Sequence, residues 1–341
     1  MKRGILLVIL ALALAWPVLA ADGPTIDTGA IAAEIKYSKI LNDMDSGTDF
    51  VITVSWPYAL IQDVELGKLL EYDLVTHRLV NTFSFPSGRF MMFAGPGGQI
   101  FMLGSDSIWQ FEEWASARSF LEKGTGTAPK TIPLTGVRLD SPGRQYRFKV
   151  GPAGTFFIHD RKAQTLYACA KDGTLINSYP CPSAFVPMPG GSYITALDQK
   201  EKGILIEETQ VVSRSSMTEQ KEVPGISRRV FLDSGIPTLV GMESDGSALL
   251  LLYPPMPEVG DEETGAVATI PSTLFQGSDT ADIRMVVMRV DTTGHATPFI
   301  SVPLGEGDGM FDIATGSLWH LQPAIGSEGT LIGLNIRRKP L

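Results

Sequence analysis

The chain has 341 residues, with 28 Lys and Arg against 37 Asp and Glu, so its formal net charge is −9 at pH 7. This acidic balance argues against nucleic acid and against an anionic membrane surface as partners, because both require clustered basic residues. The basic clusters that exist, Arg228-Arg229 and Arg337-Arg338-Lys339, are too small to reverse that balance. We expect them to be solubilising surface charge.

The first 21 residues have the pattern of a signal peptide. Lys2 and Arg3 precede an unbroken apolar run from Ile5 to Ala15, and Val18-Leu19-Ala20 gives a small-residue cleavage pattern. The run is shorter than the roughly 20 residues that a membrane anchor needs, and we expect no membrane span elsewhere. The sequence therefore predicts a cleaved signal peptide over residues 1–21 and a periplasmic or secreted protein.

Short apolar strands recur behind a glycine turn along the rest of the chain. The strands that follow such a turn are "TDFVITVSW" after Gly47, "QIFML" after Gly98, "TFFIHD" after Gly154, "SYITAL" after Gly191, "SALLLLY" after Gly246 and "SLWHLQ" after Gly316. An apolar strand precedes most of these turns, and third and fourth strands follow several of them, as in "TLYACA" and "TLINSYP". One four-stranded sheet cannot bury both of its faces, whereas a radial stack of sheets can.

This repeat predicts an all-β fold, a six-bladed β-propeller of four-stranded antiparallel blades, over residues 22–341 as a single domain. The chain finishes at "TLIGLNIRR", which is typical of a third strand with no fourth behind it. The lone strand Ala33–Leu41 is expected to supply the missing outer strand and so to close the ring without an exposed edge. A pair of β-sandwiches is the alternative, and Gln110–Leu121 is the best helical candidate.

The blade pattern resembles six-bladed propellers of the NHL and TolB-like type. In those proteins an inner strand, a glycine-containing turn and a second strand precede a third strand that ends in Asp-x-x-Gly. The nearest approach to their wording here is "FFIHDRKAQTLYAC". The resemblance covers most of the chain, but it is one of fold, and fold does not fix function.

Polar residues gather where second strands meet third strands, which in a propeller is the rim of the central channel. These candidates are Asp106, His159, Asp160, Arg161 and Asp198, and Asp312 lies on an expected inner strand. One hypothesis is a polar or metal site at the channel mouth; the other is that these residues are solvated turn residues. His159 and Asp160 are neighbours on a strand and point to opposite faces, so they do not form a dyad alone. His320 is expected to be a hydrogen-bonded residue in or near the core.

The lactonase branch of six-bladed propellers has a metal site that resembles a cage of Glu, Asp and Asn oxygens, the ligands that Ca²⁺ requires. This chain has four Asn, at 42, 81, 177 and 335, and none lies in a mapped rim loop or on a mapped inner strand. That site is therefore not carried over. No cofactor is predicted, and Ca²⁺ stays a minor alternative.

The two cysteines, Cys169 and Cys181, do not form a CxxC motif. A two-residue turn at Asp172-Gly173 would place Cys169 opposite Ile176 on the neighbouring strand. A disulfide between the two cysteines and a pair of buried thiols both remain open.

An insertion at about 254–282 combines three prolines with Glu258, Asp261, Glu262 and Glu263. A loop of this length is usually functional or disordered, and we expect either an acidic docking loop or a solvated one. The chain has no GxSxG, HExxH or phosphate-loop pattern. The sequence thus favours an exported, non-catalytic binding or scaffold protein that recognises a protein, peptide or glycan through one face. The alternative is a metal-dependent, lactonase-like hydrolase at the channel mouth, and the oligomeric state stays open.

Overall fold

The structure is a computed structural model that describes most of the chain beyond the first 29 residues. It describes residues 30–36, 50–63, 67–76, 78–84, 90–123, 128–140, 145–181, 184–188, 191–199, 203–211, 227–230, 236–254, 284–303, 310–314, 316–325 and 331–341. The predicted signal peptide and all but the first residue of the 254–282 insertion lie outside these ranges.

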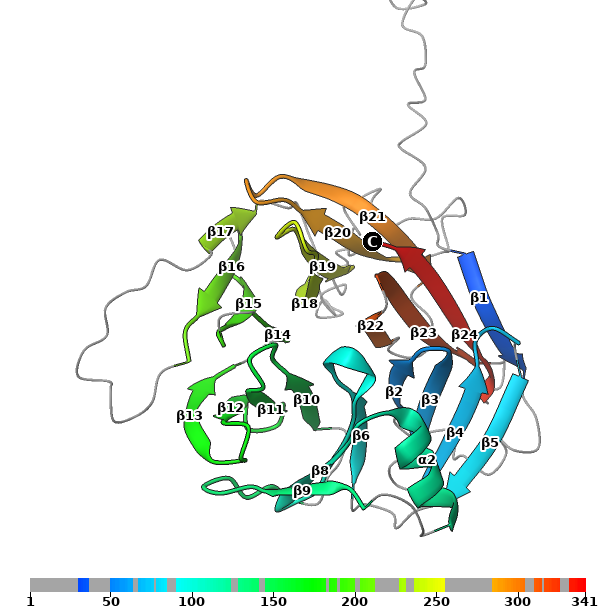
Figure 1. The fold of residues 1–341 in the computed structure, drawn as a ribbon. Coiled ribbons are helices and arrows are strands. Elements are labelled where there is room, and N and C mark those ends of the chain that lie inside the picture. Colours follow the sequence, from blue (N-terminus) through cyan, green and yellow to red (C-terminus); the bar gives the residue numbers. More distant parts are fainter. Residues whose placement is uncertain are drawn as a thin grey trace, which may run out of the picture.

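The described strands form six four-stranded antiparallel sheets, arranged around a common centre (Figure 1). Four sheets are β2(Phe50–Ser55) to β5(Arg78–Ser84), β6(Met91–Ala94) to β9(Lys130–Pro133), β10(Tyr146–Val150) to β13(Leu175–Pro180) and β14(Phe185–Pro187) to β17(Ser227–Val230). The fifth runs from β18(Ile236–Met242) to β21(Ala296–Pro303), and the last has the order β1-β24-β23-β22. The middle strands of these first five sheets are β3(Tyr58–Asp63), β4(Lys68–Asp73), β7(Ile100–Leu103), β8(Ser107–Phe111), β11(Phe156–Asp160), β12(Thr165–Cys169), β15(Tyr193–Asp198), β16(Ile204–Thr209), β19(Ala248–Tyr253) and β20(Arg284–Val290). This confirms an all-β propeller of four-stranded antiparallel blades.

The chain ends close the ring. β1(Ala30–Lys36) pairs with β24(Leu331–Pro340), beside β23(Ser317–Ile325) and β22(Met310–Ala314). An N-terminal outer strand for the last sheet was predicted, although it begins at Ala30 and not at Ala33. The first strand of one sheet contacts the first strand of the next around the centre, as β2 does with β6 and with β22. These first strands therefore surround the propeller axis.

Apolar side chains of neighbouring sheets interlock to form the core. Alternate residues of one strand belong to different clusters: Leu250 and Leu252 pack toward the sheet β14–β17, whereas Leu249 and Leu251 pack toward the last sheet. This period of two follows from the pleat of a strand. Because a sheet inside the ring has neighbours on both faces, a middle strand can be apolar on both of its faces, as "ALLLLY" of β19 is.

Most predicted glycine turns are first hairpins of a blade. Gly98, Gly154, Gly191, Gly246 and Gly316 all have a positive φ, a conformation that favours glycine. The blade β2–β5 differs, and there the prediction is wrong. "TDFVITVSW" contains the innermost strand β2, and the first hairpin is the two-residue turn Trp56-Pro57, which joins Ser55 to its partner Tyr58.

Two local predictions also need correction. The β12–β13 turn is one residue longer than expected and ends in Gly173 at φ +86°, so Cys169 pairs with Leu175 and not with Ile176. Arg228 is buried, and its guanidinium donates to the carbonyl oxygens of Gly246 at 2.7 Å and Asp291 at 3.1 Å. It therefore ties β17 to two turns of the next sheet and is not solubilising surface charge.

The helix α2(Trp114–Lys123) lies in the connection between β8 and β9, close to β5 (Figure 1). The predicted helix began four residues too early, because Gln110 and Phe111 belong to β8. Within the described ranges, no helix combines the length and apolar character needed to cross a membrane.

Candidate functional site

The predicted rim residues lie where second strands end, but they have different surroundings. Asp106 is exposed in the β7–β8 loop and accepts a hydrogen bond from the Ser107 hydroxyl at 3.0 Å. Asp160 ends β11, and its Oδ1 accepts the backbone N–H groups of Lys162 and Ala163 at 3.0 Å each. This is an Asx turn, in which the carboxylate shapes the loop that carries the exposed Arg161.

His159 is not an exposed ligand at the channel mouth. Its ring is 4% exposed and donates from Nε2 to the carbonyl oxygen of Cys181 at 2.8 Å. It also packs edge-on against Phe185, with ring centroids 5.8 Å apart. Burial lowers the pKa of this imidazole. The ring is thus held neutral between two sheets, away from the other rim candidates.

The remaining candidates are described in part or not at all. Asp198 is the last residue of β15. Asp312 lies on the innermost strand β22, and its backbone pairs with that of Trp319 on β23. The structure does not describe the side chains of these two residues, and Glu258, Asp261, Glu262 and Glu263 lie outside the described ranges. Among the side chains that are described, no three His, Cys, Asp or Glu gather as a metal site would require.

Cys169 and Cys181 are both buried and are not joined by a disulfide. Cys169 ends β12, whereas Cys181 follows β13 and packs with Phe157 and Phe185 toward the next sheet. Burial raises the pKa of the Cys169 thiol to about 12. The sequence left a disulfide and a pair of buried thiols open, and the structure shows two buried, inert thiols.

An exposed indole was missed in the sequence. Trp56, in the β2–β3 turn, is 46% exposed, yet its ring is fixed by two neighbours from the far end of the chain. The buried Trp319 lies beneath it with ring centroids 6.0 Å apart, and the guanidinium carbon of Arg338 lies 5.5 Å from the Trp56 centroid. Arg338 is equally close to Trp319, at 5.4 Å.

Two further exposed apolar residues lie at turns that are hydrogen-bonded to the turn of Trp56 or to the β22–β23 turn of the sheet of Trp319. Val75 follows Leu74, whose N–H donates to the carbonyl oxygen of Pro57, so the β4–β5 turn lies against the turn of Trp56. Leu341 donates its N–H to Gly316 in the β22–β23 turn of the sheet that carries Trp319. We call Trp56, Val75, Arg338 and Leu341 the Trp56 surface. The "SWPY" turn was its only sequence signal, because the other members come from distant segments.

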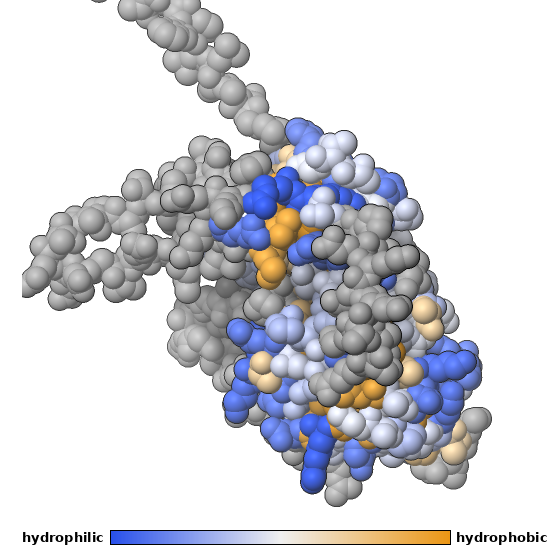
Figure 2. All heavy atoms as spheres, turned by 90° about the vertical axis from the view of Figure 1, so that its left-hand side faces the viewer, coloured by the Kyte–Doolittle hydropathy of each residue, from blue (hydrophilic) through white to orange (hydrophobic). Residues whose placement is uncertain are grey.

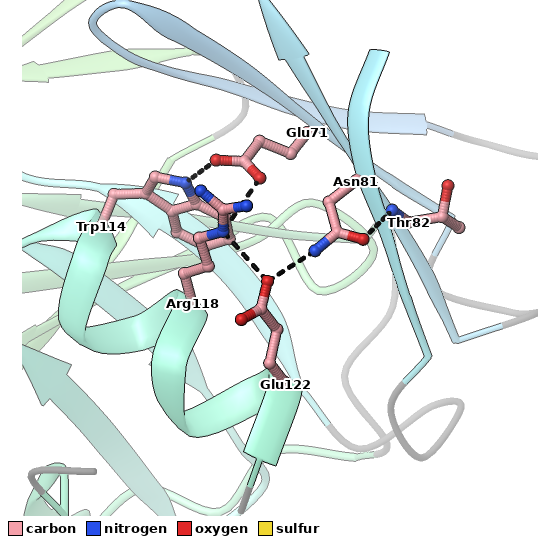
Figure 3. A network of polar contacts seen from close by, with 6 residues as sticks. All are labelled: Glu71, Asn81, Thr82, Trp114, Arg118 and Glu122. Atoms are coloured by element: carbon pink, nitrogen blue, oxygen red, sulfur yellow. Dashed lines mark hydrogen bonds and ion pairs between the residues drawn. The ribbon is translucent and has the colours of Figure 1, made fainter. Parts of the chain in front are cut away.

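A second polar cluster joins α2 to the sheet β2–β5 (Figure 3). Trp114 Nε1 donates to Oε1 of the fully buried Glu71 at 2.6 Å, and Arg118 Nε lies 3.4 Å from Glu71 Oε2. Arg118 also contacts Glu122, which accepts a hydrogen bond from Asn81 of β5 at 2.6 Å. Each of these residues contacts another member of the same cluster, and the buried Oε2 of Glu71, which has no hydrogen-bond partner among the described residues, faces Arg118 as an ion pair. The cluster therefore anchors the helix, and it presents no chemistry to a ligand.

The side of the molecule that carries β13, β16 and β17 has a mostly hydrophilic described surface, with smaller hydrophobic areas between the polar residues (Figure 2). Of the four large apolar side chains that are exposed in the described ranges, three belong to the Trp56 surface and one, Val80, lies on the outer strand β5. Three of the four exposed large apolar side chains of the described ranges therefore belong to the turns that make up the Trp56 surface.

No protein-family model and no curated protein matches this chain. Among solved structures it is similar to virginiamycin B lyase from Staphylococcus aureus, at 12% identity over 90% of this chain and 87% of that one, with a TM-score of 0.45. It is also similar to regucalcin, a calcium-binding protein from Agrobacterium tumefaciens, at 14% identity over 93% and 97%, with a TM-score of 0.46. A luciferin-regenerating enzyme gives 10% identity over 89% and 94%, with a TM-score of 0.45. These neighbours include enzymes and a binding protein, so the likeness names no function for this chain.

Proposed function

We propose that this chain is an exported, non-catalytic, six-bladed propeller that binds a protein or peptide partner through the Trp56 surface. One observation carries the proposal: an indole that is 46% exposed is held in place by Trp319 and Arg338. The export part rests on the N-terminal sequence pattern.

An exposed and immobilised indole suits binding. Trp and Arg are enriched among the residues that dominate protein–protein affinity, where they fill well-packed and desolvated pockets. Here the contacts with Trp319 and Arg338 fix the indole before any partner arrives, so less conformational entropy is lost in the complex. If Trp56 had no binding role, the protein would lose no function by burying this indole in the core.

The neighbours of Trp56 favour a protein over a glycan. Val75 and Leu341 offer aliphatic surface and no side-chain hydrogen-bonding group. An apolar side chain of a protein gains from covering such a surface, whereas a sugar would leave hydroxyl groups without partners there. The rim residues Asp106, Asp160 and Arg161 contrast with this, since they are polar or serve a turn.

The test compares Trp56→Ala with a matched apolar truncation elsewhere. Val80 is 43% exposed on β5 and provides the control, Val80→Ala. Peptides are first selected on the mature wild-type protein from a random display library, and their dissociation constants are then measured with all three proteins. We expect Trp56→Ala to raise Kd at least about tenfold and Val80→Ala to leave it unchanged. Equal Kd values for the three proteins would refute the proposal.

A further inference from the structure

We propose that Arg338 binds a carboxylate of the partner, so that the recognised peptide pairs an Asp or Glu with a large apolar side chain that packs on Trp56. This inference rests on the proposed function and specifies the chemistry of the ligand at the same surface.

Arg338 is exposed and oriented, and it makes no ion pair with a described residue. Its Nε donates to the Ser317 hydroxyl at 2.9 Å, and its guanidinium lies over the rings of Trp56 and Trp319. No carboxylate of the described residues lies within ion-pair distance of it. Within the described part of the chain, the other two guanidinium nitrogens therefore have no carboxylate partner.

Other arginines have acceptors for their guanidinium groups among the described residues. Arg289 makes a two-pronged pair with Glu243, with both N–O distances at 2.5 Å. Arg118 contacts Glu71 and Glu122, and Arg228 donates to two carbonyl oxygens. In each of these cases the structure supplies the acceptor. For Arg338 the described residues supply the orientation but no carboxylate acceptor, which is the role that we assign to a ligand.

A carboxylate is the group that fits this fork. Two parallel N–H groups of a guanidinium match the two oxygens of a carboxylate, and such charge-assisted pairs are about twice as strong as neutral hydrogen bonds. Stacking on two indoles restrains the guanidinium plane, so little rotamer freedom is lost when the pair forms. An acidic side chain of the partner meets this requirement.

The distance between the two anchors suggests a sequence spacing. The guanidinium carbon of Arg338 lies 5.5 Å from the Trp56 ring centroid. In an extended peptide, side chains two positions apart project to the same side about 6.6 Å from each other. We therefore infer a ligand motif in which an Asp or Glu stands two residues from a Phe, Leu or similar side chain.

The experiment uses a set of fluorescently labelled decapeptides and the full mature protein. Each peptide carries one Asp and one Phe at a separation of one to four residues, and matched peptides replace Asp by Asn or Phe by Ala. Kd is measured by anisotropy for wild type, Arg338→Gln, Trp56→Ala and the control Arg138→Gln. Arg138 is an exposed arginine between β9 and β10. Thermal melts establish that all variants are folded.

We expect the separation of two residues to bind most tightly. Replacing Asp by Asn should weaken binding to the wild type about tenfold, and it should have no further effect on Arg338→Gln, because the same pair is then already broken. Arg138→Gln should behave as the wild type.

The possible failures can be told apart. If binding requires Trp56 but is indifferent to both Arg338→Gln and Asp→Asn, this inference is wrong and the proposed function stands. If no peptide binding depends on Trp56, both are wrong. If acidic oligosaccharides bind in a Trp56-dependent manner and peptides do not, the partner is a glycan, which also overturns the inference.

Discussion

The sheets β10–β13 and β22-β23-β24-β1 each carry a buried histidine at the same place, the fourth residue of the second strand. His159 and His320 are 4% and 1% exposed. The Nε2 of His159 donates to the carbonyl oxygen of Cys181, which the connection between β13 and β14 brings alongside. His320 stacks on Phe311 with ring centroids 4.4 Å apart, and within the described part of the chain neither of its ring nitrogens has a hydrogen-bond partner.

The difference teaches that burial alone does not decide what a polar residue contributes. A buried donor with an acceptor is neutral or mildly stabilising, whereas a buried donor without one loses its hydrogen bonds to water and gains nothing. His159 therefore helps to hold two sheets together. His320 costs stability, and its ring is tolerated because stacking and apolar packing surround it.

The largest expected effect is the loss of stability that His320 causes in acid. Burial and the nearby charge of Arg337 lower the pKa of His320 from 6.5 to about 3. Between these two values the unfolded chain binds the proton and the folded chain does not, so the free energy of unfolding falls as the pH falls from 6.5 towards 3. At pH 4.5, two units below 6.5, the loss from this residue is roughly 3 kcal/mol.

Urea unfolding of wild type and His320→Leu at pH 7.5, 5.5 and 4.5 measures this loss. The difference between the two proteins should widen on acidification, in favour of His320→Leu. Carboxylates that titrate in the same range, such as Asp172, Asp245 and Asp291 with their lowered pKa values, are present in both proteins and cancel. A difference that stays constant with pH would show that His320 is protonated in the folded state or reached by water.

At neutral pH the same substitution should have opposite signs at the two positions. His320→Leu removes two unpartnered nitrogens and should raise the free energy of unfolding by about 1 kcal/mol, whereas His159→Leu leaves the Cys181 carbonyl oxygen without its donor and should lower it by about 1–3 kcal/mol. His295→Gln, at an exposed turn position, is the control and should change nothing. If both leucine variants are destabilised equally, packing and not hydrogen bonding governs the two sites.

The features that the sequence predicted correctly are the local ones. A glycine turn between two apolar strands needs no knowledge of the rest of the chain, and five of the six hairpins follow from that pattern. The sixth has Trp56-Pro57 in place of glycine, and it was therefore misplaced. Ring closure was predictable because the chain has an unmatched strand near its beginning and an incomplete sheet at its end.

The features that were missed depend on what neighbouring sheets bring alongside. His320 was expected to be a hydrogen-bonded residue in or near the core; it is buried, but its ring nitrogens have no hydrogen-bond partner among the described residues. His159 was expected at the rim, and it is instead buried and bonded to a carbonyl oxygen from a connecting segment. Arg228 becomes structural through turns of the next sheet. Likewise, the Trp56 surface joins Trp56 to Arg338 across nearly the whole chain, a proximity that no local pattern contains.

Glu71 extends the comparison to a third buried titratable group, whose partners come from a helix. Glu71→Gln keeps an oxygen that can accept from Trp114 Nε1 but removes the charge that faces Arg118. Because Arg118 is one-third exposed and retains Glu122, we expect a loss of only about 1 kcal/mol in the free energy of unfolding. The control Glu122→Gln, on the exposed side of the same cluster, should cost less than about 0.5 kcal/mol. The double variant Glu71→Gln/Arg118→Gln separates the hydrogen bond from Trp114 and the ion pair with Arg118. If the ion pair contributes, the second substitution destabilises the protein less once the first has been made. Additive losses would mean that Glu71 acts through Trp114 alone, and that one well-placed neutral donor is enough for a buried acceptor, as the Nε2–H of His159 is for the carbonyl oxygen of Cys181.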